Sequence, residues 1–372
     1  MDRFGFVMEQ IFGHRTHYHN LRRYVEDDAS VAATWLPIAF EPTGALAKTP
    51  VLRGNWSARA SWLAHRAVTA ARAKTRFDAL LYHTQVTALL APFQRGVPIV
   101  VSLDATPINY DTVGVYYGHT ASGPLEALKL RANRRAFAHA AALIVWRAWA
   151  KDSLVNDYGV PAEKVHVISP GVDLAQWPLV TPEERLRASA GRTPRLLFVG
   201  GDFERKGGRV LLDCFERWLA GRCELDIVTQ TTIAPPTGVR LHSALTPNSD
   251  ELKRLYAEAD IFVFPTLADC APLAVPEAMA ASLPIVTTRV GAIPEMVQDG
   301  VTGLLVAPGD PDGLHDALER LLGSPEERVR MGAAARAVAE RVDDAERNAA
   351  RVLDVLRSVS SRTGAAMEGA AS

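Results

Sequence analysis

A strand-to-helix turn in the second half of the sequence combines glycines with two adjacent cations. The segment Phe198–Gly208 ends an apolar run with Gly200 and Gly201 and then places Arg205 and Lys206 before a predicted helix. Glycines let a backbone approach a phosphate closely, and two cations balance the charge of a diphosphate. The segment predicts a diphosphate site, although a strand–turn–helix with solvated charges has the same pattern.

Two carboxylates, Asp269 and Glu277, follow a second apolar run and lie eight positions apart. A loop of small residues separates them, and a helix is expected after Pro276. The free amides at a helix N-terminus attract anions, and Glu277 is suited to accept hydrogen bonds from sugar hydroxyls. In the alternative interpretation, Glu277 only complements the helix dipole and Asp269 only caps the helix.

Two loops have weaker patterns. Residues Leu245–Leu252 run into a helix that Ser249 or Asp250 is expected to cap. Loops at the carboxyl ends of strands form the ligand crevice of a doubly wound sheet, so this loop is a candidate for contacting a nucleotide base. The sequence Asp310-Pro311-Asp312 matches a DxD metal motif, but its place at a helix start predicts a cap, and we expect no metal.

Short apolar, β-branched runs alternate with helical patterns along the chain. Such runs are typical of strands buried on both faces of a parallel sheet, and their alternation with helices indicates βαβ units. The predicted strands are Phe4–Met8, Ala79–Tyr82, Ile99–Leu103, Ala142–Val145, Val165–Ile168, Arg195–Val199, Glu224–Val228, Ile261–Phe264, Pro284–Thr287 and Gly303–Val306. The fold class is therefore α/β, with two Rossmann-like, doubly wound parallel sheets.

The proline- and charge-rich stretch Trp177–Pro194 separates two halves of the chain. We predict an N-terminal domain over residues 1–170, joined by a C-terminal helix over 342–358, and a second domain over 171–341. That helix has an apolar stripe that must pack against the chain, formed by Ala349, Val352, Leu353 and Leu356. The small, polar residues 359–372 predict a disordered tail.

The composition excludes several classes of protein. The 372 residues have a formal net charge of −1, which provides no field for nucleic acid. The three cysteines have neither CxxC spacing nor an even count, which argues against disulfides and zinc and fits a reducing cytoplasm. Neither a signal peptide nor a membrane span is expected. Basic and aromatic residues in Arg53–Arg76 and Lys129–Arg135 leave two interpretations open, a solvated helix face or peripheral contact of the N-terminal domain with the inner membrane face.

Read in order, these segments resemble the retaining glycosyltransferases of family 4, which have the GT-B fold. The resemblance covers residues 165–312 and is carried by Pro170–Asp173, Val199-Gly200, Lys206-Gly207, Leu255-Tyr256, Ala259-Asp260, Glu277–Ala280, Pro294-Glu295 and Gly303–Val306. It implies transfer of a sugar, with retention of configuration, from a nucleotide diphosphate sugar to a saccharide, lipid or small-molecule acceptor. It implies no metal or other cofactor. A silent nucleotide-sugar-binding protein and a GT-B sugar-nucleotide epimerase remain alternatives.

The resemblance also assigns roles to residues. It makes Lys206 the diphosphate lysine, Glu277 the ribose carboxylate and Asp269 the carboxylate near the sugar. The backbone amides of Leu273 and Ala274 then face the phosphates or the sugar, and Leu245 lies on the donor side of the site.

Two departures from the family pattern concern these roles. Asp269 stands where the family has a glutamate and is one methylene shorter. Gly201 replaces the arginine that usually follows the strand-end glycine, so that Arg205 has to supply the second cation.

The N-terminal half has weaker similarity. Gly13 follows the first strand, where the family has a glycine-rich loop near the donor phosphates. Asp104 follows the strand Ile99–Leu103, where the family often has a histidine. Together with His17 and His119, Asp104 is a candidate for the acceptor side, and the alternative for each histidine is a surface or structural role.

Overall fold

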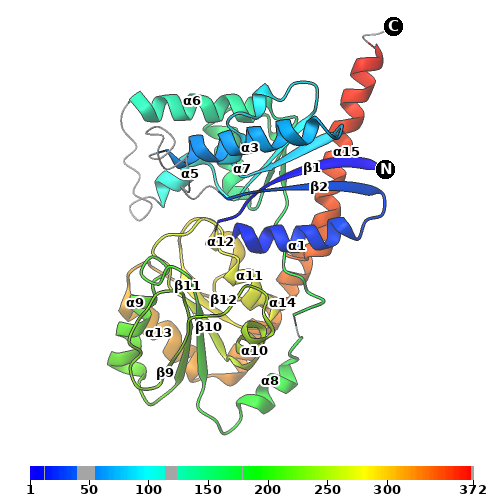
Figure 1. The fold of residues 1–372 in the computed structure, drawn as a ribbon. Coiled ribbons are helices and arrows are strands. Elements are labelled where there is room, and N and C mark those ends of the chain that lie inside the picture. Colours follow the sequence, from blue (N-terminus) through cyan, green and yellow to red (C-terminus); the bar gives the residue numbers. More distant parts are fainter. Residues whose placement is uncertain (12, 40–54, 114–123, 178, 370–372) are drawn as a thin grey trace. The chain divides into compact units, whose positions relative to one another are not determined.

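The computed structural model describes residues 1–11, 13–39, 55–113, 124–177 and 179–369. These residues form two compact units. The first consists of Met1–Asp111, the described residues from 124 to Pro170 and the residues from Ala345 onward, and the second consists chiefly of Gly171–Asp344. Within the described ranges, each unit contains a six-stranded parallel sheet with helices packed against it (Figure 1).

The sheet of the first unit has the strand order β2-β1-β3-β4-β5-β6. Its strands are β1 (Asp2–Glu9), β2 (Val31–Ile38), β3 (Ala79–His83), β4 (Ile99–Leu103), β5 (Ala142–Val145) and β6 (Val165–Val167). Its helices are α1 (His14–Glu26), α3 (Trp56–Arg72), α4 (Gln85–Ala88), α5 (Pro107–Thr112), α6 (Pro124–His139), α7 (Ala148–Asn156) and α15 (Ala345–Gly369).

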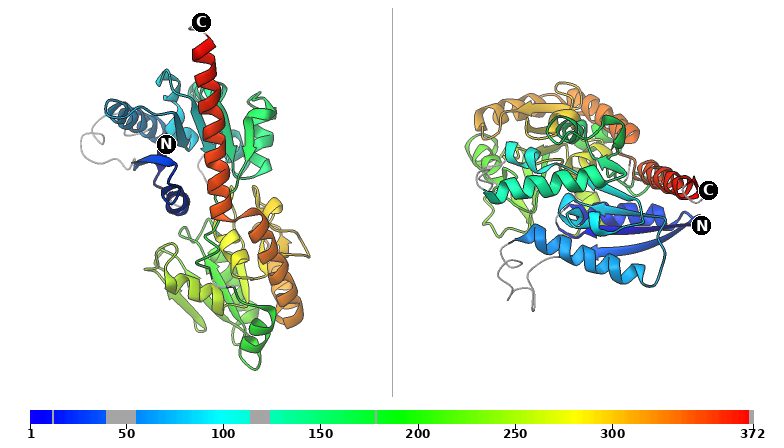
Figure 2. Two further views of the ribbon diagram at one scale, coloured as in Figure 1. Left: turned by 90° about the vertical axis from the view of Figure 1, so that its right-hand side faces the viewer. Right: turned by 90° about the horizontal axis from the view of Figure 1, so that it is seen from above.

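Both faces of this sheet are buried. Successive side chains of a strand point to opposite faces, so Val7 joins one core while Phe6 and Met8 join the other. The core around Phe6 is covered by α1 and α15, which pack side by side (Figure 2). The predicted apolar stripe of α15 is the part of the helix that enters this core.

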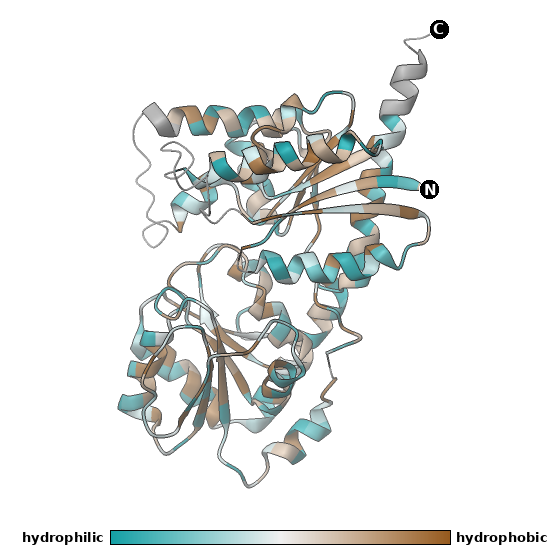
Figure 3. Cartoon of the chain, in the orientation of Figure 1, coloured by the Kyte–Doolittle hydropathy of each residue, from teal (hydrophilic) through white to brown (hydrophobic). Residues whose placement is uncertain are grey.

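The sheet of the second unit has the order β12-β11-β10-β7-β8-β9. Its strands are β7 (Arg195–Val199), β8 (Glu224–Val228), β9 (Val239–His242), β10 (Ile261–Phe264), β11 (Ile285–Thr288) and β12 (Gly303–Val306). Its helices are α8 (Pro182–Ser189), α9 (Gly208–Cys214), α10 (Asp250–Glu258), α11 (Ala274–Ala280), α12 (Ile293–Met296), α13 (Pro311–Leu322) and α14 (Pro325–Val342). The central strands of both sheets are mainly hydrophobic, as expected for strands covered on both faces (Figure 3).

The direction in which strands are added reverses once in each sheet. It reverses between β1 and β3 in the first sheet and between β7 and β10 in the second. Ligands of doubly wound sheets bind outside the carboxyl ends of the strands at such a reversal. The loops that follow these four strands are therefore the places to look for a site.

Two strands, β2 and β9, are missing from the sequence-based prediction. Both lie at a sheet edge, where a strand has only one neighbour and needs no continuous apolar run. In β9, Arg240 and His242 are polar because their side chains bind Asp226 of β8, at 2.7 and 2.8 Å.

Several predicted boundaries also differ from the structure, including those of two helices. The helix α15 continues to Gly369, whereas the predicted helix ends at residue 358 and was expected to be followed by a disordered tail. Val359 is buried in the same core as Leu356, which extends the apolar stripe by one turn. The helix α11 begins at Ala274 rather than after Pro276, because a proline in the first turn of a helix lacks only an amide that would have no partner there.

Candidate functional site

The loops after β7 and β10 meet through a glycine. Gly207 has a φ of +78°, and a Cβ atom added to it would lie 1.8 Å from the carbonyl oxygen of Pro265. Only glycine fits this position, and the close approach lets the Leu267 amide donate to the Arg205 carbonyl at 2.9 Å. The glycine turn therefore joins two of the predicted site segments.

Lys206 and Asp269 form an ion pair across these two loops. Their side chains are only 15% and 10% exposed, and the Lys206 ammonium also lies over the ring of Phe264, 5.4 Å from its centre. Burial lowers the pKa of Lys206, and the charge of Asp269 opposes that shift. The Asp269 carboxylate also accepts the amide of Cys270 at 2.9 Å. Two of the predicted catalytic residues thus form an ion pair that is largely shielded from solvent.

Arg205 is folded back along its own loop. Its Nε donates to Asp202 at 2.9 Å, and one Nη donates to the carbonyl of Ala268 at 2.9 Å. The side chain is 13% exposed, so it does not extend into bulk solvent. Arg205 therefore places a second positive charge next to Lys206.

The start of α11 supplies amides and a carboxyl group. The amides of Val275 and Glu277 donate to backbone carbonyls, whereas those of Leu273 and Ala274 have no acceptor among the described residues. Glu277 is 7% exposed, and its Oε2 accepts the Tyr256 hydroxyl at 3.0 Å. Burial raises the pKa of Glu277 to about 7, although the Tyr256 hydrogen bond acts in the opposite direction. Small changes in its surroundings therefore change its charge near neutral pH.

The remaining predicted residues of this unit lie farther along the chain. Leu245 follows β9, is half-buried and packs against the core, and its contact with a nucleotide base stays a prediction. Ser249 caps α10 by accepting the amide of Leu252 at 3.3 Å. Asp310 caps α13 by accepting the amide of Gly313 at 2.9 Å, so the cap interpretation of this motif is confirmed. Within the described ranges, no group of three or more His, Cys, Asp or Glu side chains could hold a metal ion.

In the first unit, the predicted residues differ in burial. Gly13 is exposed and directly precedes α1. His17 is buried, and burial followed by the charge of His14 lowers its pKa to about 3. Asp104 is buried after β4, where burial raises its pKa and the Tyr110 hydroxyl donates to it at 3.2 Å. His119 lies outside the described residues.

Three ring side chains that were not predicted as site residues surround His17, namely those of His14, His83 and Trp146. His83 ends β3 and shares a hydrogen bond of 3.0 Å with His14, and its ring stacks on Trp146 with the centres 5.7 Å apart. Glu9 ends β1 and accepts the hydroxyl of Thr84. Burial raises the pKa of Glu9 and lowers that of His83, so it shifts both groups toward their neutral forms. Glu9 and His83 are polar residues at the ends of β1 and β3, the two buried strands at the strand-order reversal. A polar residue that directly follows an apolar run is the sequence signal by which both could have been predicted.

The charge and aromatic pattern that suggested a membrane has partners in the structure. The Arg66 guanidinium lies over the Trp62 ring, 4.8 Å from its centre, and Arg72 donates to Gln94 at 3.0 Å. None of the helices in the described ranges combines the length and hydrophobicity needed to span a bilayer. Peripheral membrane contact stays a prediction.

Comparison with solved structures establishes the class of fold. Sucrose-phosphate synthase from Thermosynechococcus elongatus has a TM-score of 0.77 and 16% identity, with 96% of this chain and 99% of that chain covered. Anabaena Alr3699/HepE in complex with UDP-glucose has a TM-score of 0.71 and 16% identity, with 96% and 100% covered. The two doubly wound sheets and the similarity to these solved structures define a GT-B fold.

Comparison with protein families then identifies the chain. Residues 13–176 match the family described as Glycosyltransferase Family 4, and residues 193–324 match the one described as Glycosyl transferases group 1. The chain belongs to glycosyltransferase family 4. One relative is the MMP alpha-(1->4)-mannosyltransferase of Mycolicibacterium hassiacum, which is 35% identical over 51% of this chain and 47% of that protein. The chain spans about half the length of the curated relatives it matches.

Proposed function

We propose that this protein is a glycosyltransferase that transfers a sugar from a nucleotide diphosphate sugar to an acceptor hydroxyl with retention of configuration. The observation that carries the proposal is the cradle at the β7–β10 reversal. It combines two largely buried cations, Arg205 and Lys206, with open amides at the start of α11. Membership of family 4 supports it, as does the UDP-glucose bound to the similarly folded Anabaena protein.

In the proposed mechanism, Glu277 accepts hydrogen bonds from the ribose hydroxyls, and the loop at Leu245 lies beside the base. Lys206 and Arg205 hold the diphosphate together with the amides of Leu273 and Ala274. As the bond between the sugar and the diphosphate breaks, its electron pair passes to the leaving diphosphate oxygen. The acceptor oxygen forms its bond to the same sugar carbon from the same face, and the hydroxyl proton passes to the leaving diphosphate. Fixed cations in a site with little water stabilise that growing charge. The cations make a metal unnecessary for this step, and we assign no protein nucleophile.

Asp269 has two functions in this mechanism. In the absence of donor it neutralises Lys206, which would otherwise be a buried, unpaired charge. When a diphosphate engages Lys206, the Asp269 carboxylate becomes free to bind hydroxyls of the sugar. The exchange of one anionic partner for another keeps Lys206 paired throughout.

The acceptor side is assigned to the first unit. His17 and Asp104 are its predicted residues, with His119 as a further candidate and Gly13 near the donor phosphates. Burial lowers the pKa of His17 and raises that of Asp104, which disfavours the charged form of each and suits an uncharged hydroxyl better than an anion. The acceptor is a saccharide, a lipid or a small molecule, the protein acts in the cytoplasm, and a lipid acceptor would place it at the inner membrane face.

A thermal-shift screen against UDP-, GDP- and ADP-sugars tests the proposal, because a ligand that binds only the folded state raises its melting temperature. The donor found in this way is then incubated with and without acceptors, and released nucleoside diphosphate is measured. Slow hydrolysis that acceptors accelerate supports a transferase. Binding without release of diphosphate indicates a silent binding protein, and a changed sugar on an intact nucleotide indicates an epimerase. No shift with any sugar nucleotide refutes the proposal.

A further inference from the structure

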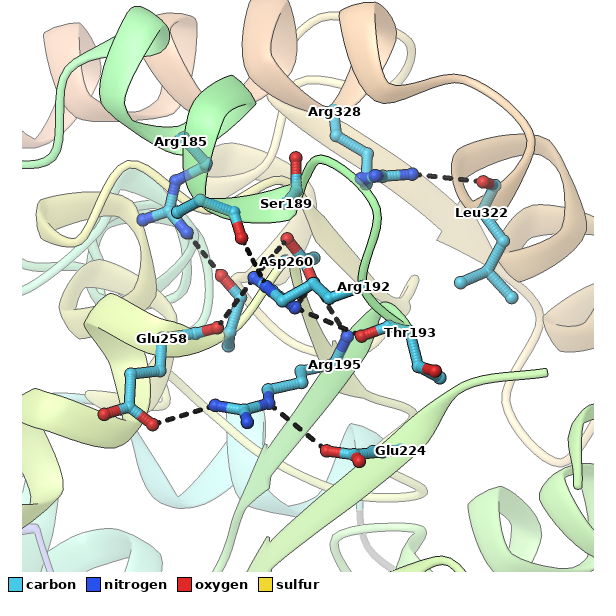
Figure 4. Close-up of polar contacts among 12 residues, drawn as sticks. Arg185, Ser189, Arg192, Thr193, Arg195, Glu224, Glu258, Asp260, Leu322 and Arg328 are labelled. Carbon is cyan, nitrogen blue, oxygen red and sulfur yellow. Dashed lines mark hydrogen bonds and ion pairs between the residues drawn. The ribbon is translucent and has the colours of Figure 1, made fainter. Parts of the chain in front are cut away.

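A network of arginines lies at the amino ends of the central strands β7 and β10, opposite the carboxyl ends at which the candidate donor site lies (Figure 4). Arg192 binds the buried carboxylate of Asp260 through both Nη atoms, at 2.7 and 3.0 Å, and Arg195 binds two further carboxylates. Arg185 and Arg328 behave differently. Among the described residues, their guanidinium groups donate to backbone carbonyls and to no carboxylate.

Arg185 joins the ends of two helices. It comes from α8 and is 4% exposed, and its two Nη atoms donate to the carbonyls of Ala259 and Ala281, the latter at 2.6 Å. Ala259 is the C-cap of α10, and Ala281 is the C-cap of α11. Helix C-terminal carbonyls have a partial negative charge and no partner within the helix, so a buried cation between two of them holds the helices together.

The same two helices provide the two partners of the buried hydrogen bond at the candidate donor site. Tyr256 lies in the last turn of α10, three residues before Ala259, and Glu277 lies four residues before Ala281. The Tyr256 hydroxyl donates to Glu277 over 3.0 Å, between residues 21 positions apart. Both side chains are buried, so their separation depends on how α10 and α11 are placed against each other.

We propose that Arg185 is a positioning residue for the donor site: by tying α10 to α11 it sets the Tyr256–Glu277 hydrogen bond, and with it the placement of the carboxylate that binds ribose. The inference rests on the proposed function, because it assigns the ribose to Glu277. Arg185 touches neither substrate nor Glu277 and acts through the two helices.

The chain offers a matched control for Arg185. Arg328 is also 4% exposed, and its Nη1 donates to two carbonyls at the end of α13, those of Leu321 at 2.7 Å and Leu322 at 3.1 Å. The helix α13 contains none of the residues assigned to the donor. Arg185→Gln and Arg328→Gln therefore remove equivalent buried clamps, of which only one reaches the donor site.

The experiment measures the Kd of UDP, GDP or ADP, whichever binds the wild type most tightly, at several pH values around 7, together with the melting temperature. We expect both variants to lose stability and only Arg185→Gln to weaken nucleotide binding, by about two- to thirtyfold. We also expect its pH midpoint for binding to rise, because the Tyr256 hydrogen bond lowers the pKa of Glu277 and is weakened when the helices separate. Tyr256 is the titratable group that acts on Glu277. The terminal phosphate of the nucleotide also titrates near this pH, but it does so in every variant alike, so a difference in midpoint between variants reports the Tyr256–Glu277 pair.

A double variant tests the route of the effect. If Arg185 acts through the hydrogen bond, Arg185→Gln should not move the midpoint further in a Tyr256→Phe background. Should Arg185→Gln fail to fold, Arg185→Lys, which keeps the charge but not the forked geometry, is expected to shift Kd and midpoint in the same direction by less.

The outcomes separate the inference from the proposed function. A wild type that binds no nucleoside diphosphate refutes the proposed function itself. A wild type that binds, with a Kd and midpoint unchanged in Arg185→Gln or Arg185→Lys, overturns the inference alone. Equal weakening by Arg185→Gln and Arg328→Gln also overturns it, because the effect is then general destabilisation.

Discussion

Replacement of Lys206 by methionine tests the charge-stabilising step, because it removes the charge and keeps much of the side-chain volume. The Lys206 side chain is 15% exposed, which favours an effective dielectric constant of about 20 over that of water. At that value, unit charges about 3 Å apart interact by about 5.5 kcal/mol. If about half a unit of charge develops on the leaving diphosphate, the loss is about 3 kcal/mol, or roughly a hundredfold in kcat.

The assay is the initial rate of nucleoside diphosphate release at saturating donor, with thermal unfolding measured in parallel. Arg209→Gln is the control, since Arg209 lies three positions on with a 53% exposed side chain, and we expect its kcat to stay close to wild type. Lys206→Met also leaves Asp269 without its cation. The double variant Lys206→Met/Asp269→Asn removes that stranded carboxylate, and the low kcat should persist in it. A single variant within about threefold of wild type, or recovery in the double variant, would refute the reasoning.

Three further predictions concern the same unit. Asp269→Asn should bind nucleoside diphosphate more tightly, as measured by calorimetry, because Lys206 no longer has a competing anionic partner. The same variant should turn over the sugar donor more slowly. Weaker binding of the nucleoside diphosphate would contradict the proposed exchange of anionic partners at Lys206. The pKa of Glu277 is about 7 in the folded protein against 4.5 ordinarily, so as pH rises from 4.5 to 7 the wild type should lose about 3 kcal/mol of stability relative to Glu277→Gln, as measured by unfolding at several pH values. The same variant should bind nucleoside diphosphates weakly, with no pH dependence near 7 beyond that of the nucleotide's own terminal phosphate. At Gly201 an added Cβ meets nothing within 4 Å, so Gly201→Arg should keep its melting temperature and lower the Kd of nucleoside diphosphate; an unchanged Kd would show that Arg205 already suffices.

The central strands were predictable because burial on both faces leaves a continuous apolar run in the sequence. The run Ile261–Phe264 is completely buried in β10, and it was predicted with its observed bounds. Two of the edge strands, β2 and β9, were not predicted; β9 alternates apolar residues with Arg240 and His242, whose partner lies on β8. The hydrophobic pattern of a sequence indicates which residues are buried, but it does not indicate which polar side chains pair with each other.

The same limit applies to the site. Lys206 and Glu277 stand out because each occurs in a local pattern with a glycine turn or a helix start. The Tyr256–Glu277 hydrogen bond joins residues from different helices, and the Arg185 clamp joins residues 74 and 96 positions apart. Such contacts depend on how the helices pack on the sheet, and no local sequence pattern encodes that packing.

The two strand-order reversals hold groups of opposite electrostatic character. The reversal in the second unit gathers cations, and Lys206 keeps an anionic partner despite burial. The reversal in the first unit gathers carboxyl and imidazole groups whose pKa values burial moves toward the neutral form, upward for Glu9 and Asp104 and downward for His17 and His83. A diphosphate that gains negative charge as it leaves requires the cations of the second unit. A hydroxyl group that attacks without a charge does not require them and is compatible with the groups of the first unit. One fold thus provides, at equivalent places in its two sheets, separate environments for the charged and the uncharged reactant of the proposed transfer.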